Sequence, residues 1–269
     1  MHPQAFRLAE ELSLPVMVCM DGFVLTHAWE RIEVPDQAQV DAFLPPYEPR
    51  QVLDPAEPVS IGAMVGPEAF TEVRYLAHAK QMQALEAIPR IASEFRQVFG
   101  RDCGGPVHPY ACEDAETIVV ALGSVFGTVC DVVDEMRENG VRIGALAITS
   151  FRPFPLEAVR AALGRARQVV VLERALAVGI GGIVSANVRT ALSGIQLDGH
   201  TVIAGLGGRA ITKASLHRLF ADAPAGRLGQ LTFLDLDTDL VERELARMAR
   251  TRRSGPPAEN ILRDVGSNR

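Results

Sequence analysis

The sequence is poor in several residue types, and each shortage excludes a class of protein. Its four cysteines contain no C-x-x-C pair, which excludes a zinc ribbon and a local iron–sulfur framework. No apolar run reaches the ~18 residues of a membrane-spanning helix, and the N-terminus lacks the apolar core of a signal peptide. The net charge of −6 gives no indication of nucleic-acid binding. We therefore expect a cytoplasmic protein with reduced thiols that binds neither membranes nor nucleic acids.

The residues that are present indicate an ordinary globular protein with an uneven charge. Hydrophobic residues make up 48% of the chain and charged residues 22%, which is enough to bury a core. Residues 1–59 hold ten acidic and three basic residues, a net charge of −7, so the rest of the chain is close to neutral. This shift predicts a boundary near residue 60. Cys19 and Cys130 lie in apolar runs and are expected to be small core residues.

The first part of the chain contains too few regular elements for a core of its own. Residues 3–11 have a helical pattern, and the apolar run L-P-V-M-V-C-M at 14–20 is typical of a buried strand. An apolar strand without neighbours implies a missing partner, so we expect residues 1–60 to pack poorly against the sheet at 116–236 and to dock on another polypeptide. The alternative is that residues 14–20 simply extend the main sheet.

Two further segments separate this part from the main domain. Six prolines interrupt residues 35–60 and predict an extended linker. Residues 67–99 carry apolar side chains at helical spacings, which predicts one long helix. We expect Pro89 to kink this helix and Gly100 to end it.

After residue 115 strand and helix patterns alternate, joined by short connections. Such an order predicts an open, mostly parallel sheet with helices on both faces across residues 116–236, an α/β fold. Thr128 is the expected N-cap of the first of these helices. The stretch 251–269, rich in Arg, Gly and Pro, is expected to be disordered. The expected strands are 117–122, 143–149, 169–172, 200–204 and 231–234, and the expected helices are 128–140, 155–163, 183–192, 212–220 and a segment after 239.

One polar cluster follows the apolar run of the N-terminal part. Asp21, Thr26, His27 and Glu30 combine residue types that could perform acid–base catalysis. The alternative is that Asp21 caps a turn and that His27 is a packed, hydrogen-bonded residue. If the cluster is catalytic, Asp21, Thr26 and His27 are the candidate catalytic residues. No metal ligand is predicted.

Three glycine-containing loops follow expected strands, at 123–128, 179–182 and 205–209. Ser124 and Gly127 in the first loop could present backbone N–H groups to a phosphate, but the loop lacks both the dinucleotide and the P-loop spacing. A tight turn with an N-cap is the alternative there, and close packing is the alternative for the other two loops. Arg174 at a strand end could orient a carboxylate, or it could form an ion pair across a subunit contact, which we favour.

Several motifs together resemble one enzyme family. Between 141 and 183 the order is strand, R-P-F-P, helix, strand, E-R, G-x-G-G, helix. This order, with the motifs named next, resembles the alpha subunit of 2-oxoacid:ferredoxin oxidoreductases, typified by pyruvate:ferredoxin oxidoreductase. The resemblance runs from about residue 3 to residue 245. The other motifs are P-V-M-V-x-M-D-G-F-V-L-T-H at 15–27, L-P-P-Y at 44–47, A-L-G-S-V-F-G-T at 121–128 and G-L-G-G-R at 205–209.

The resemblance implies a role inside a larger complex. It divides the chain into a remnant of a pyrimidine-binding domain at 1–34, the proline-rich linker at 35–60, a transketolase C-terminal-like domain with its leading helix at 61–250, and the tail at 251–269. It implies thiamine diphosphate, Mg²⁺ and iron–sulfur clusters in the complex, with none bound by this chain alone. The implied partners are beta and gamma/delta subunits, ferredoxin and coenzyme A.

Two other functions are compatible with parts of the sequence. The chain could be a non-catalytic assembly module that supports a catalytic partner. It could also be an independent nucleotide-binding α/β protein, although none of its glycine loops has the spacing that such binding requires. On the resemblance, we expect the isolated chain to be inactive.

Overall fold

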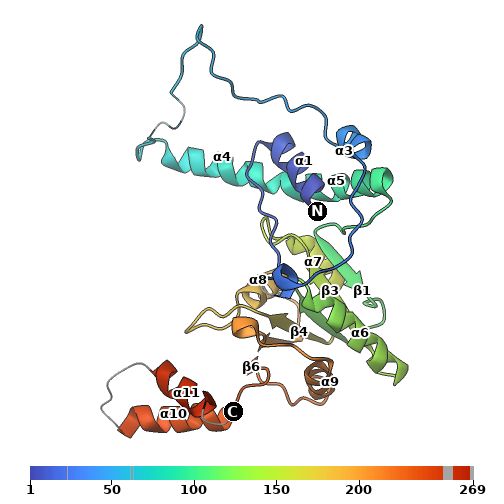
Figure 1. The fold of residues 1–269 in the computed structure, drawn as a ribbon, viewed down its shortest axis with the longest axis vertical. Coiled ribbons are helices and arrows are strands. Elements are labelled where there is room, and N and C mark those ends of the chain that lie inside the picture. The colour runs from blue at the N-terminus through green and yellow to red at the C-terminus, as the bar shows by residue number, and fades with distance from the viewer. Residues whose placement is uncertain (23, 61, 63, 251–256, 267–269) are drawn as a thin grey trace. The chain divides into compact units, whose positions relative to one another are not determined.

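The computed structural model describes residues 1–22, 24–60, 62, 64–250 and 257–266 (Figure 1). The described chain divides into two compact units, Met1–Thr232 and Phe233–Arg269. The first unit holds an N-terminal group of helices and an α/β sheet. The second holds two C-terminal helices.

The sheet confirms the predicted open, mostly parallel α/β architecture. Its six strands lie in the order β1-β3-β2-β4-β5-β6. Parallel pairing joins β3 to β2, β2 to β4 and β4 to β5, whereas the edge strand β1 runs antiparallel to β3. The strands are β1 Val107–Tyr110, β2 Thr117–Ala121, β3 Ile143–Ile148, β4 Gln168–Glu173, β5 Asp198–Ile203 and β6 Leu231–Phe233.

Helices cover both faces of the sheet because its central strands are apolar on both sides. Every residue of β2 and of β4 is buried, as in strands that contact helices on each face. Helix α7 (Leu156–Leu163) packs beside α8 (Ile183–Ala191), and α6 (Val125–Glu138) packs beside α9 (Lys213–Asp222). The core on the α7 and α8 side contains Ile118, Val120, Leu146, Val159, Leu163, Val171, Val184 and Val188.

The expected start of the first sheet helix was wrong by one turn. Helix α6 begins at Val125, directly after Ser124, so Thr128 lies inside the helix and is not its N-cap. The N-cap that has the expected chemistry belongs to α9, where the Thr212 hydroxyl accepts the Ser215 N–H at 3.1 Å.

The N-terminal helices form a small core of their own. They bury Leu12, Phe43 and Ile91 together, and Phe43 makes edge contacts with Phe95 and Phe99 at ring-centroid distances of 5.6 and 5.5 Å. The first prediction, a helix at 3–11, is confirmed. The helices are α1 His2–Leu12, α2 Val24–His27, α3 Gln37–Phe43, α4 Phe70–Met82 and α5 Ala84–Phe99.

Two predictions for the middle of this region need correction. The proline-rich linker at 35–60 contains helix α3, because 37–43 holds no proline and Phe43 is buried at its end. The chain after α3 is irregular, as expected (Figure 1). The single helix at 67–99 is two helices that meet at Gln83, and α5 continues through Pro89. Gly100 ends α5 in the left-handed conformation, as predicted.

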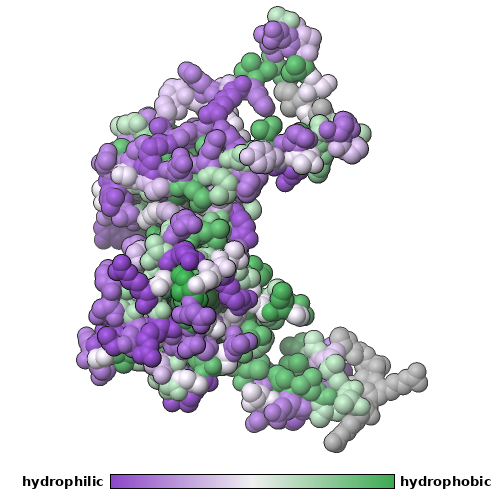
Figure 2. All heavy atoms as spheres, turned by 180° about the vertical axis from the view of Figure 1, so that it is seen from behind, coloured by the Kyte–Doolittle hydropathy of each residue, from purple (hydrophilic) through white to green (hydrophobic). Residues whose placement is uncertain are grey.

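The predicted buried strand at 14–20 is also wrong. This stretch has no regular structure, and Met17 and Met20 are exposed by 87% and 58%. Cys19, expected in the core, is exposed as well. An apolar run becomes a buried strand only beside other strands, and residues 14–20 pair with no strand of the described sheet. Hydrophobic side chains accordingly appear on the surface among hydrophilic ones (Figure 2).

The C-terminal unit contains α10 (Thr238–Arg250) and α11 (Pro257–Gly266). Arg247 of α10 donates to Asp264 of α11 at 2.9 Å. The prediction of a disordered tail is therefore wrong for 257–266, while 251–256 and 267–269 lie outside the described residues. No helix in the described part of the chain is long and apolar enough to cross a membrane.

Candidate functional site at the carboxyl edge of the sheet

The strand order places a topological switch point between β2 and β4. From β2 the chain moves to β3 on one side, and it then returns to β4 on the other side of β2. Loops that leave two such neighbouring strands diverge, and open α/β sheets bind ligands in the crevice that this leaves at the carboxyl ends of the strands. The loops after β2 and β4 therefore form the first place to look for a site.

A carboxylate from the N-terminal segment fills this switch point. Ser124, in the turn after β2, donates its backbone N–H to Asp21 Oδ2 at 2.7 Å, and its hydroxyl donates to the same oxygen. Arg174, directly after β4, places Nη1 3.1 Å from Asp21 Oδ1. Each carboxylate oxygen thus has its own partner, in an arrangement that helix N-termini and arginines commonly offer to anions.

The surroundings keep Asp21 ionised. Burial alone raises the pKa of this carboxyl, but hydrogen bonds from the Ser124 hydroxyl and N–H and the charge of Arg174 outweigh it and lower the pKa below its ordinary value. The side chains of Asp21 and Arg174 are only 19% and 24% exposed, so solvent screens this pair less than an ordinary surface ion pair.

Two glycines make room for the pair. Gly123 has φ +75°, and a Cβ there would lie 2.9 Å from Asp21 Oδ2. Gly205, after β5, has φ +67°, and a Cβ there would lie 3.1 Å from Arg174 Nε. Side chains rarely adopt this backbone conformation, so glycine serves both the turn and the close approach at each position.

The neighbouring Glu173 has a structural task. It is buried and accepts the N–H groups of Ile183 and Val184 at 2.7 Å each and that of Ser185 at 3.1 Å. The Ser185 hydroxyl donates to it at 2.7 Å. A carboxylate here satisfies the free donors at the start of α8. A Cβ at Gly182 would collide with this carboxylate, which agrees with close packing as the reason for that glycine.

The structure brings together three of the six candidate residues, namely Asp21, Ser124 and Arg174. Arg174 pairs with Asp21 of its own chain, and an ion pair of Arg174 across a subunit contact stays a prediction. Thr26 Oγ1 and His27 Nδ1 lie 3.0 Å apart, and both residues are exposed on α2. Asp21 is engaged by Ser124 and Arg174, and a catalytic role for Asp21, Thr26 and His27 stays a prediction.

Gly127 is not part of this arrangement. It lies in the first turn of α6, and a Cβ there would meet no atom within 4 Å. Sequence reasoning missed the role of Gly123, because Asp21 and Ser124 are 103 positions apart and no local pattern reveals their contact.

The described residues offer no metal centre. Among them no group of three or more His, Cys, Asp or Glu side chains is placed to hold a metal ion. The carboxylate at the switch point is already paired, so it is not a free ligand for Mg²⁺. The described residues of this chain alone do not fit a magnesium–diphosphate site.

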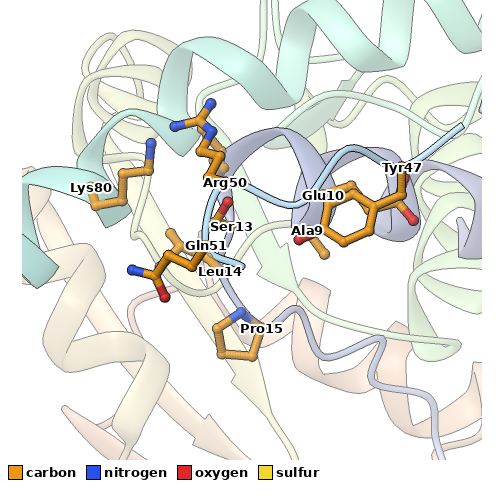
Figure 3. Close-up of a pocket in the computed structure, with 10 residues that line it drawn as sticks. Ala9, Glu10, Ser13, Leu14, Pro15, Tyr47, Arg50, Gln51 and Lys80 are labelled. Carbon is orange, nitrogen blue, oxygen red and sulfur yellow. The ribbon is translucent and has the colours of Figure 1, made fainter. Parts of the chain in front are cut away.

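A pocket lies among the N-terminal helices. It has a volume of about 650 Å³ and is lined by α1, the turn after it, Lys80 of α4 and the irregular stretch at 47–51 (Figure 3). Arg50 donates to the Glu11 carbonyl oxygen at 2.7 Å, which satisfies the end of α1. Its lining contains no pair of a nucleophile and a base in contact, so it supports no catalytic role.

Two family models match two successive stretches of the first unit. Residues 1–93 match the family model described as pyruvate flavodoxin/ferredoxin oxidoreductase, thiamine diphosphate-binding. Residues 115–216 match the pyruvate:ferredoxin oxidoreductase core domain II. The chain belongs to the pyruvate:ferredoxin oxidoreductase family. The resemblance seen in the sequence is confirmed.

Individual relatives point the same way. The chain is 38% identical to pyruvate synthase subunit PorA of Methanosarcina barkeri over 89% of its own length and 62% of that protein. It is 38% identical to PorA of Thermotoga maritima, over 83% of this chain and 58% of that protein. The ketoisovalerate oxidoreductase subunit VorA of Pyrococcus horikoshii is 32% identical to this chain, over 81% of this chain and 56% of VorA. The chain thus spans about three fifths of the length of these relatives.

The two family matches meet at the switch point. Asp21 lies in the stretch that matches the thiamine diphosphate-binding model, whereas Ser124 and Arg174 lie in core domain II. The hydrogen bonds and the ion pair of Asp21 therefore join the two family regions.

Proposed function

We propose that this chain serves as part of the alpha subunit of a thiamine diphosphate-dependent 2-oxoacid:ferredoxin oxidoreductase. The complex would decarboxylate a 2-oxoacid, pass two electrons through iron–sulfur clusters to ferredoxin and transfer the acyl group to coenzyme A. One observation carries this proposal, which is the succession of two family regions over most of the chain. Pyruvate is the proposed substrate because the PorA relatives are more similar than VorA.

Within that complex the chain would position other groups and would not perform the chemistry itself. The Asp21 carboxylate at the switch point is paired with Arg174, and the described residues form no metal centre. Thiamine diphosphate and Mg²⁺ would be completed by a beta subunit, and the clusters would lie on beta or gamma/delta subunits. Cytoplasmic ferredoxin and coenzyme A would meet the assembled complex. The domain boundaries at 34, 60 and 250 stay predictions.

Exposed apolar side chains support a partner for the N-terminal segment. Trp29 is fully exposed, and Met17, Ile32 and Val34 are exposed by 87%, 75% and 77%. Such a group of large apolar side chains marks a protein contact more often than a solvated surface. A beta subunit is the proposed occupant.

Activity of the purified chain tests this proposal. We expect no pyruvate-dependent reduction of a viologen dye by the chain alone and activity when it is co-purified with its partner subunits. Mass spectrometry of the co-purified proteins identifies the partners. Turnover by the isolated chain, or an active complex from which this chain is absent, would contradict the proposal.

The independent nucleotide-binding function is not favoured. In open α/β sheets the phosphate of a nucleotide lies at the switch point, and here the Asp21 carboxylate occupies that position. A second anion would have to displace it from Ser124 and Arg174.

A further inference from the structure

The segment that carries Asp21 is anchored to the sheet by little regular structure. Residues 14–22 form neither helix nor strand, and the short helix α2 follows. The side chains of Met17 and Met20 are exposed by 87% and 58%, so they contribute little to anchoring the segment. A segment of this kind needs specific polar contacts if it is to hold one position.

Asp21 supplies such contacts at a position formed by Ser124 and Arg174. Its carboxylate receives the Ser124 N–H and hydroxyl on one oxygen and the Arg174 guanidinium at 3.1 Å on the other. Gly123 and Gly205 leave the space that the two side chains need. The donors come from two loops that follow separate strands of a rigid sheet, so they fix both the direction and the distance of the carboxylate.

We propose that Asp21 is an intramolecular latch that holds the segment 14–34 of the thiamine diphosphate-binding region in one position on core domain II. The latch places the exposed Met17, Met20 and Trp29 where a partner subunit finds them already ordered, which lowers the entropy lost on association. Asp21 is a positioning residue in this proposal and touches no substrate. The latch needs no assumption about the reaction, because it is defined within this chain.

The position of the segment can be measured directly. A spin label on exposed Cys19, two residues before Asp21, reports the segment, and a second label on Glu138→Cys at the exposed end of α6 reports the sheet. The other cysteines, Cys103, Cys112 and Cys130, are replaced by Ala in the full chain. We expect one narrow distance distribution between the labels in this background.

Loss of the latch should broaden that distribution. Asp21→Asn removes the charge that pairs with Arg174, and Arg174→Gln removes the other half of the pair. Both changes should replace the narrow distribution with a broad one. Glu30→Gln is the matched control, because it removes the same charge from the same exposed segment and should leave the distribution narrow. A narrow distribution in Asp21→Asn, or a broad one before any change at Asp21, would overturn the latch.

A second route avoids labels and cysteine replacements. The Ser124 amide donates to Asp21, so its hydrogen exchange should become faster in Asp21→Asn while amides of the buried strand β2 keep their exchange rates. Gly123→Ala puts a Cβ 2.9 Å from the carboxylate and should have the same effect as Asp21→Asn. Gly140→Ala has a similar φ of +80° but open space, and should leave Ser124 protected. Unchanged exchange at Ser124 in both Asp21→Asn and Gly123→Ala would overturn the latch, whatever the activity of the complex.

Discussion

At the scale of single residues, charged contacts hold Asp21 at the switch point. Its carboxylate is held by two donors of Ser124 and by Arg174, and its pKa is lowered in the folded chain. The sequence could single out Asp21, Ser124 and Arg174 as polar residues at loops. It could not predict that they meet, because residues far apart in the chain leave no shared periodicity.

The lowered pKa of Asp21 gives a pH dependence with a definite sign. A group whose folded pKa lies below its unfolded pKa stabilises the fold above the unfolded value, and this contribution is lost as the pH falls through the folded value. We expect Asp21→Asn to lower the free energy of unfolding by a constant amount near neutral pH. The difference from wild type should shrink below about pH 4, the ordinary range of an aspartate. Urea unfolding across this pH range measures it, and a difference that grows in acid would contradict the assignment.

Helices and strands follow their local sequence where burial and capping agree. The continuous apolar runs of β2, β3 and β4 were predicted almost to the residue because both faces are covered. Strand β1 was missed, since its sequence V-H-P-Y contains a proline and is only half-buried. Helix α3 was hidden by the prolines around it, although its own seven residues contain none.

Helix α8 should depend on the carboxylate of Glu173. Replacement by Gln keeps the shape but removes the charge that three backbone N–H groups and the Ser185 hydroxyl share. We expect Glu173→Gln to lower the free energy of unfolding by about 1–3 kcal/mol, the usual loss for a buried, charged hydrogen-bonding group. Glu113→Gln, a change at an exposed glutamate, should stay within about 0.5 kcal/mol of wild type. Equal losses in the two variants in urea unfolding would show that the cap of α8 is not important.

The whole chain combines a sheet whose central strands are buried with an N-terminal segment that exposes apolar side chains. The sequence predicted the sheet from alternating patterns, whereas the boundary near residue 60, predicted from the shift in net charge, stays a prediction. It wrongly predicted a buried strand at 14–20, because apolar content alone does not distinguish a buried strand from an exposed irregular segment.

The single tryptophan provides a probe for the proposed contact with a partner subunit. Trp29 is fully exposed in the chain. With 5-fluorotryptophan incorporated into this chain only, we expect one ¹⁹F resonance whose chemical shift changes when the partner subunits bind. The resonance should be absent in Trp29→Phe, which confirms its assignment. A chemical shift that stays the same in an active complex would place the contact elsewhere.

The edge strand β1 has a consequence for the behaviour of concentrated solutions. It is four residues long, runs antiparallel to its neighbour and contains Pro109, which has no N–H to donate. Short edge strands with a proline are poor templates for strand addition by another molecule. This border of the sheet should therefore resist edge-to-edge aggregation, and association should proceed through side chains and not through backbone pairing.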